Sequence, residues 1–131
     1  MMQATALWAA LLAPVLIWLS MRTIRQRRRA RVAVGTGGDA ALERAVRAHA
    51  NFTEYVPFAL VMMALAEAAG TPGWIIHPIG AALFAGRIAH GLGIVRQPED
   101  FRFRVGGMMA TFTAIGAAAL AALIALAIGW G

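Results

Sequence analysis

The sequence predicts an all-α integral membrane protein, a single domain folded as an up-down four-helix bundle. The chain of 131 residues is 60% apolar and only 14% charged, and its mean hydropathy is +0.68. Its apolar residues fall in long runs that short polar or glycine-rich segments separate. This composition leaves very little mass for a soluble domain, and long helices joined by short loops pack as antiparallel neighbours.

Four membrane-spanning segments are expected, at about residues 2–21, 40–69, 74–95 and 106–130. The first is long enough to cross a bilayer and is followed by positive charge, whereas a signal peptide carries its positive charge before the apolar core. The second follows a glycine-rich turn and begins after Asp39, a preferred N-cap residue. Its first turns are polar, so its membrane part is expected from about residue 50, and Pro57 is expected to kink it. The third is rich in small residues that allow close helix contact, and the fourth carries no charge.

The distribution of arginines predicts the orientation of the chain. All twelve basic residues are arginine, and the net charge is +6. Six of them form one run after the first span: Arg22, Arg25, Arg27, Arg28, Arg29 and Arg31. Together with the arginines between residues 96 and 104, they place both of these loops in the cytoplasm and both termini outside. Lipid headgroups explain this charge without nucleic acid, and Arg25 is the member of the run best placed to reach an anionic ligand as well.

The chain has no cysteine and three histidines. Disulfides, thiolate metal sites and a cysteine nucleophile are therefore excluded. The histidines are scattered and lack the H-E-x-x-H spacing of zinc enzymes, so no metal is expected.

The densest group of polar residues opens the second helix. At 100° per residue, Arg47, Asn51 and Glu54 fall at about 0°, 40° and −20°, a narrow stripe along two helical turns. Arg44 sits at the edge of this stripe, and His49 points to the opposite side. Polar groups that enter a hydrocarbon layer face protein or a ligand, because contact with lipid is costly. The stripe suits a zwitterionic ligand, and it equally suits an internal ion pair between neighbouring helices.

Arg87 and His90 form a second polar pair, three residues apart on one face of the third helix. They lie at a depth comparable to that of the stripe. For His90 the alternative to a binding role is a neutral imidazole bonded to a backbone carbonyl or to Glu54. Four helices enclose too little space for a sizeable ligand, so both polar groups are expected to complete a site at a subunit boundary of a symmetric oligomer.

These residues resemble the motifs of a known superfamily. The pattern Arg44-x-x-Arg47-x-His49-x-Asn51-x-x-Glu54-Tyr55-x-Pro57 resembles the signature of MAPEG, the membrane-associated proteins in eicosanoid and glutathione metabolism. Gly86-Arg87-Ile88-Ala89-His90 resembles the second motif of that family. The likeness covers nearly the whole chain in the order and spacing of its spans. Arg31-Val32-Ala33-x-Gly35-x-Gly37-Gly38 and Gly106-Gly107-Met108 look closest to the bacterial YecN-like branch.

The resemblance implies a homotrimer in a bacterial inner membrane, with glutathione held as co-substrate between subunits on the cytoplasmic side. Glu54 matches the acid that meets the glutathione ammonium, and Arg47 matches the arginine near a carboxylate. Arg104 matches the arginine near the thiol and is the expected catalytic residue. The implied partners are further copies of the chain, membrane lipid and a lipophilic small molecule, with no nucleic acid. The residues that match the glutathione-binding positions are Arg25, Arg47, Asn51, Glu54, Arg87 and His90.

The chain also departs from the strong transferases of the family. These have a tyrosine where this chain has Ile94, and prostaglandin-forming relatives have a serine where it has Val105. Some relatives have an arginine in place of Ala50. Thiolate formation would then depend on Arg104 and the field of the pocket, so the resemblance implies weak activity.

Three functions follow from these observations. The first is a glutathione transferase or peroxidase that acts on lipophilic electrophiles from the bilayer. The second is a glutathione-binding membrane protein that kept the pocket and is catalytically weak or silent. The third is a small four-span transporter, which ranks last because small multidrug transporters have a glutamate in their first helix, and this chain has no acid between residues 1 and 21.

Overall fold

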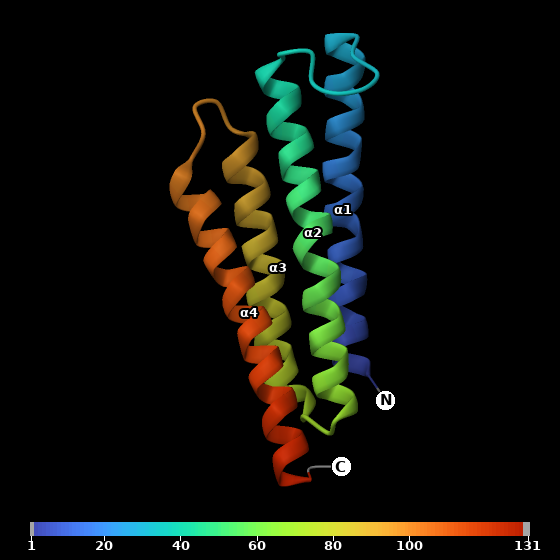
Figure 1. Ribbon diagram of the computed structural model, residues 1–131, viewed down its shortest axis with the longest axis vertical. Helices are drawn as coiled ribbons and strands as arrows, with labels where there is room; N and C mark the ends of the chain where they lie inside the picture. The colour runs from blue at the N-terminus through green and yellow to red at the C-terminus, as the bar shows by residue number, and fades with distance from the viewer. Residues whose placement is uncertain (1, 130–131) are drawn as a thin grey trace.

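A computed structural model describes residues 2–129, and every regular element in that range is a helix. The elements are α1 (Gln3–Ala30), α2 (Ala40–Ala68), α3 (Gly73–Val95) and α4 (Phe101–Ile128). Figure 1 shows them as a long up-down bundle in which both chain ends lie at the end that also holds the α2–α3 turn. The predicted all-helical fold is confirmed.

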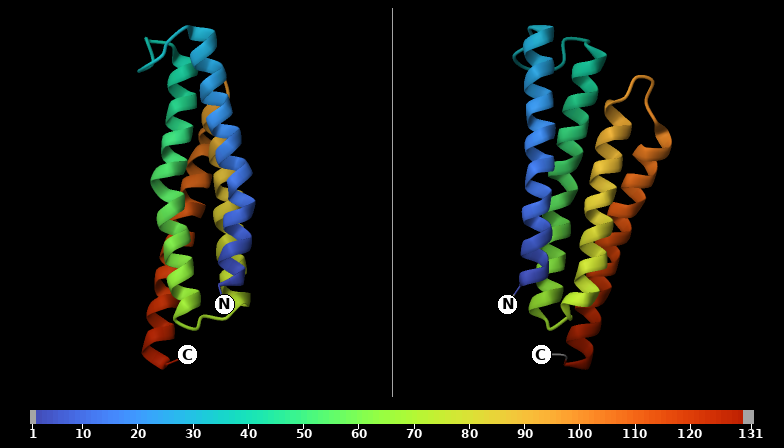
Figure 2. Two further views of the ribbon diagram at one scale, coloured as in Figure 1. Left: turned by 90° about the vertical axis from the view of Figure 1, so that its right-hand side faces the viewer. Right: turned by 180° about the vertical axis from the view of Figure 1, so that it is seen from behind.

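The bundle is centred on α2 and α3. These two helices contact each other, and each also contacts both outer helices. Within the described residues α1 and α4 do not contact each other, and Figure 2 shows them on opposite sides of the central pair. The centre is filled by side chains that are almost fully buried, among them Leu12, Leu19, Met63, Ile76 and Leu83.

The first helix extends well beyond the predicted span. It ends at Ala30 rather than near residue 21 and takes up most of the arginine run, which therefore does not form the predicted loop. Arginine is a good helix former, so its charge does not end a helix at the membrane surface. Arg27 ties this extension to the following loop, because its guanidinium donates to the carbonyl oxygens of Ala33 and Gly35 at 3.3 and 2.7 Å.

The segment between α1 and α2 contains the predicted glycine turn and N-cap. Gly35, Gly37 and Gly38 have φ angles of 73°, 55° and 77°, a left-handed conformation that residues with a Cβ rarely adopt. The Asp39 carboxylate accepts a hydrogen bond from the backbone N–H of Leu42 at 2.8 Å. It thereby satisfies one of the free donors at the start of α2.

Composition does not establish that α2 crosses the membrane. By length and composition α1, α3 and α4 are each apolar enough to span a bilayer, whereas α2 is not among the helices that meet this criterion. Its apolar part contains Asn51, Glu54 and Glu67, which lower its hydropathy. α2 is nevertheless one helix through Pro57 and packs along all three of its neighbours. The fourth crossing and the kink at Pro57 stay predictions.

Small residues let α3 and α4 pack closely, as predicted. A Cβ on Gly86 would come within 2.9 Å of the carbonyl oxygen of Gly107, and a Cβ on Gly93 would come within 2.6 Å of the backbone nitrogen of Arg104. Neither position has room for a side chain, so these glycines set the distance between the two helices.

The last helix begins earlier than predicted. It starts at Phe101 rather than near residue 106, because the Asp100 carboxylate caps it by accepting from the backbone N–H groups of Arg102 and Phe103 at 3.0 and 3.4 Å. Arg104 is therefore a residue of the first turn of α4 and not of a loop, which corrects the predicted boundary.

At the opposite end of the bundle, Glu67 of α2 holds the start of α1. Its carboxylate accepts hydrogen bonds from the backbone N–H groups of Ala4 and Thr5 at 3.0 and 2.9 Å, and from the Thr5 hydroxyl at 2.7 Å. No side chain of α1 itself caps this end. A residue from another helix thus satisfies two of the free backbone donors of α1.

Much of the described surface is apolar. Large side chains remain exposed on α1 and α4 in particular, among them Leu7, Ile17, Leu120, Leu123 and Leu126. A soluble monomer rarely exposes so much apolar surface, which suits a protein embedded in lipid. The predicted end of the fourth span, at residue 130, lies outside the described residues.

Candidate functional site

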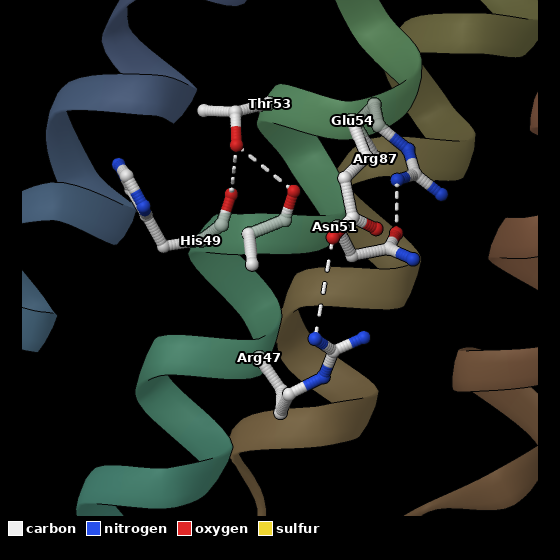
Figure 3. A network of polar contacts seen from close by, with 7 residues as sticks. Arg47, His49, Asn51, Thr53, Glu54 and Arg87 are labelled. Carbon is white, nitrogen blue, oxygen red and sulfur yellow. Dashed lines mark hydrogen bonds and ion pairs between the residues drawn. The ribbon is translucent and has the colours of Figure 1, made fainter. Parts of the chain in front are cut away.

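The polar stripe of α2 is present as predicted and faces an open side of the chain. Arg47, Asn51 and Glu54 lie together, and His49 points away from them (Figure 3). The Arg47 Nη1 and Glu54 Oε1 atoms are 4.0 Å apart, and the two side chains are 58% and 49% exposed. A pair this long and this exposed contributes little to stability. It joins two residues of one helix rather than two neighbouring helices, and it leaves both charges accessible to a ligand.

Asn51 is tied to α3 by a buried arginine. The Nη1 of Arg87 donates to the Asn51 Oδ1 at 2.7 Å (Figure 3), and its Nη2 lies 3.3 Å from the carbonyl oxygen of Gly107 and 3.4 Å from the sulfur of Met108. Arg87 is only 2% exposed, and its Nε has no hydrogen-bond partner among the described residues. Arg87 is therefore a buried cation whose contacts are all neutral groups.

His90 lies one turn beyond Arg87 and is 3% exposed. It sits at a close approach of α3 and α4, since a Cβ on Gly107 would come within 2.7 Å of the His90 Cβ. Glu54 pairs with Arg47, and among the described residues the His90 imidazole forms no hydrogen bond with Glu54 or with a backbone carbonyl, so neither predicted partner of the imidazole is found. The predicted shared face of Arg87 and His90 is confirmed, and that face is buried.

A cavity of about 260 Å³ opens between the start of α2, the end of α3 and the start of α4. It combines three guanidinium groups with two carboxylates, and we refer to it as the arginine cavity. Its Arg47 also belongs to the stripe, so the cavity and the stripe share this residue, whereas Asn51 and Glu54 do not line the cavity. The Nε of Arg44 is buried there without a hydrogen-bond partner among the described residues. The residues that line the arginine cavity are Ala40, Glu43, Arg44, Arg47, Ile94, Glu99 and Arg104.

Arg104 reaches the cavity because of the cap at the start of α4. Its backbone N–H donates to the carbonyl oxygen of Asp100 at 3.0 Å, and its guanidinium forms an ion pair with Glu99. The Arg104 side chain is still 43% exposed. Glu99 therefore offsets part of the charge of Arg104 without closing it off from the cavity.

The structure brings together some predicted site residues and leaves one apart. Arg25 is exposed on α1, which does not contact the helix that carries Arg104 within the described residues. Glu43 and Glu99 line the cavity although neither had been predicted as a site residue. Glu43 is four residues before Arg47, a helical spacing that offered a signal. Glu99 arrives through the α3–α4 segment, whose course the sequence does not reveal.

The apolar wall of the cavity bears on its chemistry. Ile94 is 5% exposed and lines the cavity at the position where strong transferases of the resembled family have a tyrosine. Tyr55 packs edge-on against Phe112 with ring centroids 5.4 Å apart, so it is a packing residue. Within residues 2–129 there is no group of three His, Asp or Glu side chains placed to share a metal ion.

Comparisons with known proteins agree with the motifs. The profile of the MAPEG family matches residues 5–124. The chain is 40% identical over 111 residues to the inner membrane protein YecN of Escherichia coli strain K12, a match that covers 85% of this chain and 83% of that protein. The YecN protein of Escherichia coli O6:H1 matches with the same identity and coverage.

Proposed function

The chain is a membrane protein that belongs to the MAPEG family, and on that premise we propose that it is a glutathione-dependent transferase or peroxidase acting on lipophilic electrophiles. Glutathione is a tripeptide with a carboxylate at each end, an ammonium beside one of them, and a thiol at its centre. The proposal therefore requires a site that offers several cations, one free acid and a cation for the sulfur.

The observation that carries the proposal is the arginine cavity together with the polar stripe of α2, which adjoins it at Arg47. Arg44, Arg47 and Arg104 supply three cations in one cavity. Glu54, at the other end of the stripe, is exposed and only loosely paired. Charge-assisted hydrogen bonds from guanidinium groups to carboxylates are among the strongest that side chains form. A zwitterion with two carboxylates matches this arrangement better than a simple anion does, because Glu54 would repel a ligand without an ammonium.

In the proposed reaction Arg104 stabilises the thiolate of glutathione. A neighbouring guanidinium favours the charged form of a thiol but donates no proton readily. The thiol proton passes to water, the thiolate sulfur forms a bond to the electrophilic carbon, and the leaving group departs with the electron pair of the bond that breaks. The enzyme contributes proximity and charge stabilisation. The electrophile reaches the site from the bilayer, where its apolar part is soluble.

We place this site at a boundary between subunits of a homotrimer. The Arg47 and Glu54 side chains are about half exposed in one chain, so a ligand bound there would keep one side open to lipid or water. A second copy of the chain would close that side. Arg25, which does not line the arginine cavity of its own chain, would be supplied to the site of a neighbour.

A catalytically silent glutathione-binding protein is the second candidate, and two observations favour it. Ile94 gives the cavity an apolar wall where a hydroxyl group would otherwise assist the thiol. Arg104 is already paired with Glu99, which reduces the electrostatic stabilisation that Arg104 can give to a thiolate.

The variant Arg104→Ala separates the two candidates. In a transferase it is expected to lower turnover at least about a hundredfold, while glutathione binding measured by calorimetry remains detectable. Arg102→Ala is the matched control, because Arg102 is an exposed arginine of the same helical turn that does not line the arginine cavity. Equal turnover in Arg104→Ala would remove the catalytic role. Glutathione binding without conjugate formation by the unaltered protein would favour the silent protein, and no binding would reject both.

A further inference from the structure

The two ends of the Asn51 carboxamide are distinguishable in this structure. An arginine guanidinium can only donate hydrogen bonds. The Asn51 atom that lies 2.7 Å from the Arg87 Nη1 is therefore the carbonyl oxygen. The NH₂ group of Asn51 donates no hydrogen bond to another described residue, and it is not among the buried polar atoms without partners. The NH₂ group is therefore not fully enclosed within the chain.

A neutral amide at this position is not the most stabilising choice beside Arg87. A buried cation without an acid partner is costly. Aspartate has nearly the same shape as asparagine and would form a charge-assisted bond with the same guanidinium. It would also present a carboxylate oxygen to the stripe in place of the NH₂ group. The presence of Asn51 thus indicates that the donor on its outer side has a use.

We propose that Arg87 is a positioning residue that holds the Asn51 oxygen, so that Asn51 presents only N–H donors to the ligand. The ligand group that faces Asn51 is then an acceptor, a carboxylate or a peptide carbonyl. The identity of the ligand in this inference rests on the proposed function. The roles of the Arg87 and Asn51 side chains do not.

Arg87 itself has no direct access to that ligand. It is 2% exposed, and both of its terminal nitrogens are engaged within the chain. Its influence on binding passes through Asn51. Along α2 the site then offers cations in the arginine cavity, a neutral donor at Asn51 and an acceptor at Glu54, which sets the direction in which a zwitterion binds.

The test is Asn51→Asp, because the proposal predicts opposite changes in stability and binding. The new carboxylate pairs with Arg87, so the midpoint of thermal unfolding in detergent should rise by a few degrees. Its second oxygen faces the acceptor of the ligand, so the Kd for glutathione measured by calorimetry should rise at least about tenfold. If the contact between Arg87 and Asn51 were merely structural, Asn51→Asp would change the unfolding temperature and leave the Kd for glutathione unchanged.

Two further variants make the result specific. Thr53→Asp adds the same charge two residues away, on the side of α2 that carries His49 (Figure 3), and it should leave the Kd within about twofold of the unaltered protein. Asn51→Ala removes both ends of the amide and should lower stability and affinity together.

Three outcomes would overturn the inference. They are a lower unfolding temperature for Asn51→Asp, an unchanged Kd in that variant, or an equal loss of affinity in Thr53→Asp. If the unaltered protein binds no glutathione, the proposed function fails, and the assignment of a ligand acceptor fails with it. A rise in unfolding temperature for Asn51→Asp would in that case still confirm that Arg87 holds the Asn51 oxygen.

Discussion

Glu54 and Glu67 are two carboxylates of the same helix that are used in opposite ways. Glu67 accepts three hydrogen bonds from the start of α1, at 2.7 to 3.0 Å. Glu54 has one partner, Arg47, at 4.0 Å, and its side chain is 49% exposed. A carboxylate offers about four lone-pair sites. Glu67 is therefore nearly satisfied within the chain, and Glu54 is not.

The two carboxylates lie in parts of the bundle that differ in how well their charges are satisfied within the chain. At the end with the chain termini, an acid from α2 secures the first turn of α1. At the arginine-rich end, three cations line one cavity with the carboxylates of Glu43 and Glu99, and Arg47 has in addition its long pair with Glu54. Charges that the fold leaves under-satisfied near a membrane are costly, and they are expected where a ligand completes them.

The largest effect on glutathione binding in this comparison is expected from Glu54→Gln. The amide keeps the shape of the side chain but cannot pair with an ammonium, so affinity should fall between about tenfold and a hundredfold. The free energy of unfolding should change by less than about 0.5 kcal/mol, since the pair with Arg47 is exposed and long. Calorimetry and thermal unfolding on the same samples measure the two quantities. A large loss of stability with intact binding would show that Glu54 is structural.

Glu67→Ala is expected to do the reverse. Three donors at the start of α1 lose a charged acceptor, so stability should fall by about 2 to 3 kcal/mol. Thermal unfolding in detergent measures this loss, and the folded fraction should bind glutathione with unchanged affinity. Glu67→Gln retains one acceptor oxygen, so its stability should lie between that of Glu67→Ala and that of the unaltered protein. Weaker binding in the folded fraction would mean that the two ends of α2 are coupled.

Asp39→Ala should have the smallest effect of the three. Asp39 lies at the arginine-rich end but does not line the cavity, so the variant tests stability at that end without changing a cavity residue. Loss of one N-cap bond should lower stability by about 1 kcal/mol. Asp39→Ser keeps a capping oxygen and serves as the control in the same unfolding measurement. If the serine variant is as unstable as the alanine variant, the cap is not the source of the effect.

Periodicity explains which parts of the site could be predicted. Arg47, Asn51 and Glu54 share one helical face whatever the helix packs against, and their angles along α2 alone are enough to group them. The cap at Asp39 and the glycine turn before it are equally local, since each depends on residues only a few positions apart. The helical content and a close helix contact of the third span were predicted from composition, whereas the identity of the neighbouring helix, α4, comes from the structure.

Helix boundaries were predicted less accurately where a charged segment continues a helix beyond its apolar span. The arginine run was expected to end the first span, and it does mark a polar segment. The backbone nevertheless stays helical to Ala30, because a membrane surface limits where charge can sit and not where helical hydrogen bonds can form. Likewise, Asp100 starts α4 before the apolar run begins.

The sequence by itself determined that this is a helical membrane protein of the MAPEG family with a polar stripe on its second helix. Only the tertiary structure decided that Arg87 bonds to Asn51, that Glu99 pairs with Arg104, and that Glu67 caps α1. The physical reason is distance along the chain. A helix relates residues three or four positions apart by its own geometry, whereas these contacts, apart from the pair of Glu99 and Arg104 across the start of α4, join residues 36 to 63 positions apart. Such pairs exist only after packing has set the rotation and depth of each helix against its neighbours.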